Sequence, residues 1–145
     1  MKRLQSWLRK LLALSWLDRW LLVEAFFGLA LIGFAIRILP FRRVARLLRL
    51  RMGDAMTAET PDLAVRVGWA VTTAAQRTPW RSTCLAQAVV GKMMLLRRKI
   101  PATLSLGVAK SPADALQAHA WLRCGEQILT GRAEYLRFNV IANFV

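Results

Sequence analysis

Hydrophobic positions recur every three or four residues through the first half of the chain. Within residues 2–14, leucines and a tryptophan share one helical stripe, and the basic side chains lie mostly off it. Ser15 followed by Asp18 predicts a capped helix start, and this second helix is expected to run to about Ile38, where a proline follows. A third, basic amphipathic helix is predicted over residues 41–51.

A polar break at residues 53–60 separates these helices from the rest of the chain. Thr60, Pro61 and Asp62 have the pattern of an N-cap, a first-turn proline and a first-turn acid. A fourth helix is therefore expected from this point to about Gln76. We expect a helical, basic and apolar N-terminal region over residues 1–59 and a second domain over residues 60–145.

The remaining pattern predicts one more helix and then only strands. Ser82 or Thr83 can cap a helix over residues 84–99, whose basic end complements the negative end of the helix dipole. Alternation and β-rich composition then predict strands, the middle pair joined by a tight turn at Gly125. These strands cover residues 102–109, 117–124, 127–131 and 136–144. Helices first and strands last favour an α+β fold over a parallel α/β fold.

The charge of the chain is strongly positive and uneven. The 145 residues carry a net charge of +14, and residues 1–51 hold 11 Lys and Arg against Asp18 and Glu24, a net of +9. Such a half suits an anionic partner, for which a membrane surface, a nucleic acid and an acidic peptide are the candidates. Nucleic acid is not expected, because the aromatic residues lie mostly in apolar stripes and are not interleaved with basic ones.

The most apolar run, residues 20–36, leaves three placements open. It contains Glu24, and its uncharged part has only 12 residues, fewer than the roughly 20 that a spanning helix needs. Burial in protein, an interfacial position and a spanning position therefore remain as alternatives. No small-residue cleavage pattern follows, so a signal peptide is not expected. Two widely separated cysteines fit a reducing cytoplasm, so we expect a cytoplasmic protein, with membrane association open.

Two residues suggest chemistry. Cys84 falls in the first turn of a predicted helix, where the dipole and the free N–H groups stabilise a thiolate and can face an oxyanion. Its structural alternative is a small buried hydrophobe. His119, the only histidine, shares a strand face with Trp121 and Arg123, and Trp121 can exclude water from it. Its alternative is a half-buried strand histidine.

Taken together, a cysteine that opens a helix and a histidine on a later strand match the arrangement of papain-like nucleophiles. One His and two Cys without paired spacing predict no metal site, and the sequence has no glycine-rich phosphate loop. We therefore expect no cofactor.

Three segments resemble a known family. They are "W-x-x-x-C-L" at 80–85, "LLRRKIPATLSLGV" at 95–108 and "AHAWL" at 118–122. Together they are similar to the lasso-peptide leader peptidases, the protease half of the lasso B protein, within the transglutaminase-like and papain-like superfamily. The resemblance implies a peptidase core over residues 60–145, with the catalytic helix packed on a small antiparallel sheet. It also implies a cysteine endopeptidase that removes the leader from a ribosomally made precursor before macrolactam closure.

The resemblance assigns roles to individual residues. Cys84 matches the nucleophile and His119 the general base, with Trp80 and Trp121 beside the substrate. The family often has an aspartate about a dozen residues after the histidine, where this chain has Thr130 and Gly131. The third catalytic group therefore stays open among Glu134, Glu126, a backbone group and Asp114.

The expected partners follow from the same resemblance. Some relatives carry a leader-recognition domain with a small sheet, but residues 1–60 show no strand pattern here. We therefore expect a separate recognition protein, besides the precursor leader and an ATP-dependent macrolactam synthetase. A transglutaminase-type thiol acyltransferase remains an alternative. So does a non-catalytic relative that binds peptide or associates with a membrane.

Overall fold

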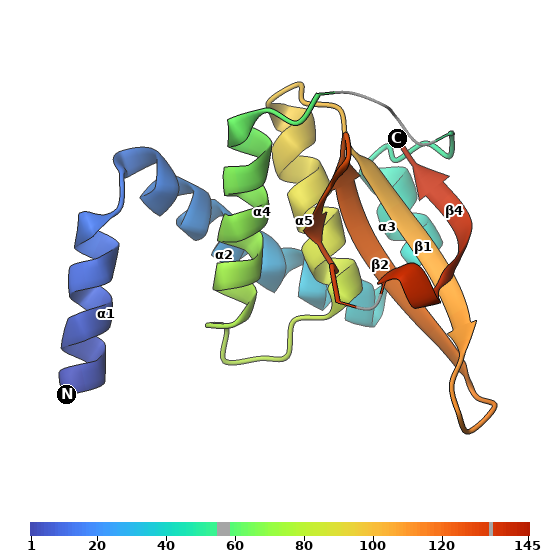
Figure 1. Ribbon diagram of the computed structural model, residues 1–145, viewed down its shortest axis with the longest axis horizontal. Coiled ribbons are helices and arrows are strands. Elements are labelled where there is room, and N and C mark those ends of the chain that lie inside the picture. The colour runs from blue at the N-terminus through green and yellow to red at the C-terminus, as the bar shows by residue number, and fades with distance from the viewer. Residues whose placement is uncertain (55–58, 134) are drawn as a thin grey trace.

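The fold is α+β, as predicted, with helices first and one antiparallel sheet last (Figure 1). The computed structural model describes residues 1–54, 59–133 and 135–145. Its helices are α1 (Lys2–Ala13), α2 (Trp16–Ile38), α3 (Phe41–Leu47), α4 (Asp62–Ala75) and α5 (Cys84–Arg97). Its strands are β1 (Thr103–Lys110), β2 (Leu116–Cys124), β3 (Gln127–Thr130) and β4 (Asn139–Phe144), and a short 3₁₀ turn covers Tyr135–Arg137.

The sheet has the strand order β3-β2-β1-β4. β1 and β2 form a long hairpin in which Thr103 pairs with Arg123 and Gly107 pairs with His119. Gly125 adopts a φ of 55°, which lets the tight turn between β2 and β3 form without a Cβ penalty. The first three strands begin and end within about one residue of the boundaries predicted from the alternation of apolar and polar positions.

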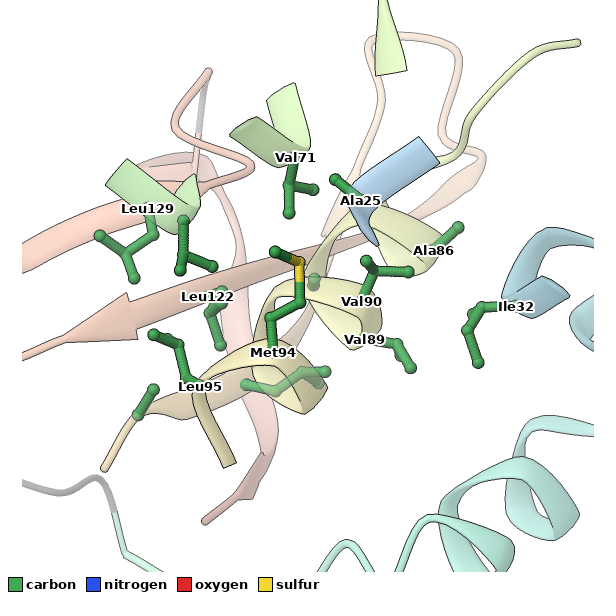
Figure 2. Close-up of a cluster of buried hydrophobic side chains, with 14 of the residues drawn as sticks. Ala25, Ile32, Val71, Ala86, Val89, Val90, Met94, Leu95, Leu122 and Leu129 are labelled. Atoms are coloured by element: carbon green, nitrogen blue, oxygen red, sulfur yellow. The ribbon is translucent and has the colours of Figure 1, made fainter. Parts of the chain in front are cut away.

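The helices build the hydrophobic core against the sheet. α5 packs on β2, and α4 and α2 pack beside it (Figure 1). Figure 2 shows side chains from α2, α4, α5, β2 and β3 meeting in one cluster, among them Ala25, Val71, Val90 and Leu122. α5 is thus the central helix, and its first residue, Cys84, is fixed by a packed element.

α2 combines the features of a core helix and a membrane helix. It has 23 residues, and its most apolar 18 residues have a mean hydropathy of 2.1, which by length and composition is enough to cross a bilayer. Its inner face lies in the core, where Leu21, Ala25 and Leu29 are fully buried. Glu24 pairs with Arg97, the last residue of α5, and with Arg98, which follows it, at 2.8 and 2.6 Å. Burial in protein therefore describes one face of this helix, and the opposite face is exposed.

Two predicted helix boundaries differ from the structure. The helix expected over residues 41–51 ends at Leu47, because the chain turns through Leu48 and Arg49, whose φ is 54°. Thr60 is not the N-cap of α4. Pro61 takes that position, and the Thr60 hydroxyl donates a hydrogen bond of 2.7 Å to Cys124 O. The threonine thus ties the start of α4 to the end of β2.

Two other differences concern strand pairing. The last strand begins at Asn139 and not at residue 136 as expected, since a 3₁₀ turn occupies Tyr135–Arg137. Met52 forms an isolated bridge with Phe144, so the N-terminal half reaches the sheet at this point. Part of the polar break, residues 55–58, lies outside the described residues, and the domain boundary after residue 59 stays a prediction.

Candidate active site

Cys84 begins α5 and carries a free, half-buried thiol. The sequence left Ser82 and Thr83 as alternative N-caps, and the structure shows Thr83 in this position. Its hydroxyl oxygen accepts a hydrogen bond of 3.1 Å from Ala86 N. The Gln87 N–H donates to Thr83 O. In the described part of the chain, the N–H groups of Cys84 and Leu85 have no acceptor and remain available to an anion.

The packing of α5 on the sheet determines where Cys84 lies along the direction of the strands. Gly91 lies against β2 and β3, since a Cβ there would stand 2.7 Å from Leu122 Cδ2 and 3.8 Å from Thr130 Cγ2. Cys84 precedes Gly91 by seven residues, about 10 Å of helix, on the same helix face. His119 precedes Leu122 by three residues, about 10 Å of strand. Because the C-terminal half of α5 lies beside the end of β2, Cys84 and His119 lie at the same end of this layer.

His119 is held by its surroundings in one orientation. Its Nε2 lies 2.8 Å from Gly131 O, and its ring stacks on Phe138 and Trp121 at centroid distances of 4.9 and 5.9 Å. A carbonyl oxygen can only accept, so Nε2 carries the proton in this hydrogen bond. The lone pair of the neutral imidazole is then on Nδ1, which is the nitrogen free to take a proton.

Two of the acids proposed as the third group, Glu126 and Asp114, have no contact with this histidine among the described residues. Glu126 lies in the β2–β3 turn, and the stretch of β2 from His119 to Cys124 alone spans about 16 Å. Asp114 lies in the β1–β2 turn, where it pairs with Lys110. Glu134 lies outside the described residues. Among the open alternatives, the partner seen on the imidazole is a backbone group, the Gly131 carbonyl.

No hydrogen bond between described residues joins the Cys84 thiol to the His119 imidazole. Alternation along β2 turns His119 toward the same side as Trp121, away from Leu122, which contacts α5. Beyond the last β2–β3 pair, Gly131 still lies against this edge of β2, since a Cβ there would stand 2.4 Å from Ala120 O and its carbonyl oxygen is bound by His119 Nε2.

A pocket of about 280 Å³ lies between the start of α5 and the C-terminal half of α2. Trp80 lines it and packs on Phe26 at a centroid distance of 5.4 Å. Arg37 and Arg81 are also in its lining, and neither forms an ion pair with a described acid. Trp121, in contrast, is only 5% exposed and lines a separate pocket on the sheet, so Trp80 is the better placed of the two to meet a substrate near Cys84.

Three features of this region were not visible in the sequence. Gly131 acts through its carbonyl, which no side-chain pattern reveals, and Phe138 reaches the histidine from the segment before β4. Lys92 is buried in the core and donates a hydrogen bond to Ala102 O. Burial lowers the pKa of Lys92, although nearby Cys124 opposes this effect. Burial likewise raises the pKa of the Cys124 thiol, which marks it as an unreactive core residue.

A half-buried thiol at the start of a central helix is a placement that favours a reactive thiolate. Within the described residues, no group of three or more His, Cys, Asp or Glu side chains is placed to hold a metal ion. Residues 28–143 match the sequence profile of the Transglutaminase-like superfamily, and the chain belongs to this superfamily. Its members are typically cysteine proteases or acyltransferases. No curated protein and no solved structure is similar enough to count as a match.

Proposed function

We propose that this protein is a cysteine peptidase that removes the leader from a ribosomally made lasso-peptide precursor. The observation that carries the proposal is the placement of Cys84 at a capped helix start, and the Gly131 carbonyl that fixes the His119 tautomer supports it. The superfamily match supports the thiol chemistry. The three sequence segments around residues 80, 100 and 120 support the choice of substrate.

The proposed reaction uses only groups of this chain. His119 Nδ1 takes the thiol proton, and Cys84 Sγ attacks the carbonyl carbon of the scissile peptide bond. The oxyanion is held by the N–H groups of Cys84 and Leu85. The imidazolium returns the proton to the leaving amine, which leaves a thioester on Cys84. Water, deprotonated by the same imidazole, then hydrolyses the thioester and releases the leader.

Cleavage of the precursor tests this proposal. Wild-type protein and the Cys84→Ala and Cys124→Ser variants are incubated with the precursor, and the products are identified by mass spectrometry. We expect cleavage by wild type and by Cys124→Ser, and none by Cys84→Ala, because only Cys84 can form the thioester. Cleavage by Cys84→Ala at the wild-type rate would refute the enzyme assignment.

The same assay with an added primary amine separates the peptidase from the acyltransferase alternative, since water and amine attack the same thioester. A peptidase yields the free leader acid. If the product is mainly the amide of the added amine, the transferase reading is correct instead.

We further propose that a separate protein delivers the leader. Apart from the Met52 bridge, the described residues before α4 form only helices and loops, so this half offers no sheet edge of its own to a peptide. Ordering a flexible leader costs several kcal/mol, which a partner can offset by raising its local concentration. Cleavage should therefore be slow with this chain alone and fast when the recognition protein is added. Equal rates would place the leader site within this chain.

The proposed setting is the cytoplasm, where both cysteines would stay reduced, as they are here. There an ATP-dependent synthetase would close the macrolactam on the released peptide.

A further inference from the structure

The first two helices expose large apolar side chains at helical spacing on each helix. We call this set of side chains the outer stripe. Its members recur every three or four residues and are each 46% to 78% exposed. They are Leu4, Leu8 and Leu12 of α1 and Trp16, Trp20, Val23, Phe27, Leu31, Phe34 and Ile38 of α2. A soluble monomer rarely exposes so large an apolar surface unless something binds to it.

The exposure of the outer stripe does not result from poor packing of α2 on the domain. α2 is fixed to the domain by its inner face, by the pairs from Glu24 to α5, and by the pair between Asp18 and Arg66 of α4 at 2.7 Å. α1 has no buried residue and stands away from the body (Figure 1). A hollow of about 520 Å³ remains between α1, α2 and α4. The protein itself therefore leaves the stripe uncovered.

The charge of residues 1–51 indicates which kind of partner surface can cover the outer stripe. All 11 Lys and Arg of residues 1–51 are exposed, and the two acids of this segment, Asp18 and Glu24, are already paired with arginines of α4 and α5. A second copy would bring two such basic segments together, which opposes self-association. The occupant should instead be anionic and apolar at once.

We infer that α1 and the outer stripe of α2 lie in the interface of an anionic bilayer. Cationic residues combined with tryptophan, phenylalanine and leucine on one helix face are typical of helices that lie in the membrane plane, and Trp16 and Trp20 of the stripe stand in the first turns of α2. A spanning position of α2 would separate Glu24 from its arginines and remove the inner face from the core. α2 therefore rests on the bilayer with its axis along the surface.

Vesicle flotation tests the inference directly. Phosphatidylcholine vesicles with and without about one third phosphatidylserine are mixed with the protein at low and high salt. We expect binding only to the anionic vesicles, weakened by salt, with a blue shift of tryptophan fluorescence. The double variant Phe27→Gln/Leu31→Gln alters side chains that are 66% and 69% exposed, so it should fold normally and bind at least about tenfold more weakly.

The matched control is Leu116→Gln/Leu136→Gln, which removes two apolar side chains that are 72% and 84% exposed but lie outside the stripe. This variant should bind like wild type. The inference fails if wild type does not bind anionic vesicles. It also fails if the stripe variant and the control bind equally. Self-association of the wild type in sedimentation, without vesicle binding, would assign the stripe to a second copy.

Discussion

At the scale of single residues, the key observation is that a backbone carbonyl orients His119. The resemblance implies an aspartate in this region, and Gly131 occupies it with its oxygen 2.8 Å from Nε2. A neutral carbonyl fixes the tautomer as a carboxylate would, but it stabilises an imidazolium less. The position suits glycine, because its φ is 72° and a Cβ would stand 2.4 Å from Ala120 O.

Gly131→Ala should therefore destabilise the protein, by roughly 1–3 kcal/mol in the free energy of unfolding. Urea denaturation measures the change. The matched control is Gly33→Ala, where a Cβ meets nothing within 4 Å in the middle of α2. That variant should gain about 0.5–1 kcal/mol from helix propensity. Equal stabilities of the two variants would contradict the strain assigned to Gly131.

Lys92 predicts a dependence of stability on pH. Because burial lowers its pKa in the folded state below the ordinary 10.5, the unfolded chain binds more protons between the two values. Its contribution therefore makes the protein more stable as pH rises through the lowered pKa toward 10.5. Cys124, whose pKa burial raises, acts in the opposite direction above its ordinary value of 9.0.

The contribution of Lys92 is measured by comparing the Cys124→Ala variant with the double variant Cys124→Ala/Lys92→Met, since neither protein has the Cys124 thiol. The free energy of unfolding of the Lys92 protein, relative to Lys92→Met, should increase from about pH 7 to about pH 10. If the difference in unfolding free energy stays constant or decreases over this range, burial does not lower the pKa of Lys92.

At the scale of elements, the ion pairs of Glu24 hold α2 on α5. Glu24→Gln keeps the shape of the side chain but removes the charge from a mostly buried pair, so it should cost about 1–3 kcal/mol of unfolding free energy. The control is Asp114→Asn, in the exposed pair with Lys110, which should change stability by less than about 0.5 kcal/mol. Similar losses in thermal or urea unfolding would contradict a special role for Glu24.

Element boundaries were predictable where a local rule decides them. Ser15 caps α2 by accepting from Asp18 N, and Thr83 caps α5, as their spacing to the helix starts predicts. The cap prediction at Thr60 was wrong, because a tertiary hydrogen bond to Cys124 O uses its hydroxyl. The sequence also suggested Cys84 and His119, since each has a local signature. It could not show the Gly131 carbonyl or Phe138, because both reach the histidine only through the sheet.

At the scale of the whole molecule, α2 links the two proposals. Its inner face belongs to the core that fixes α5, and its outer stripe is the inferred membrane surface. Phe34 belongs to the stripe and also lines the pocket beside the start of α5. If both proposals hold, a bilayer under α2 would lie beside the pocket at the start of α5.

The central claim is that His119 activates Cys84, and alkylation of the thiol by iodoacetamide tests it without any substrate. Peptide mapping by mass spectrometry gives the labelling rate of each cysteine in wild type and in His119→Gln, which keeps a donor for Gly131 O but has no base. The account predicts rapid labelling of Cys84, a fall of about tenfold or more in the folded variant, and no labelling of buried Cys124. Equal Cys84 rates in the two proteins would contradict it.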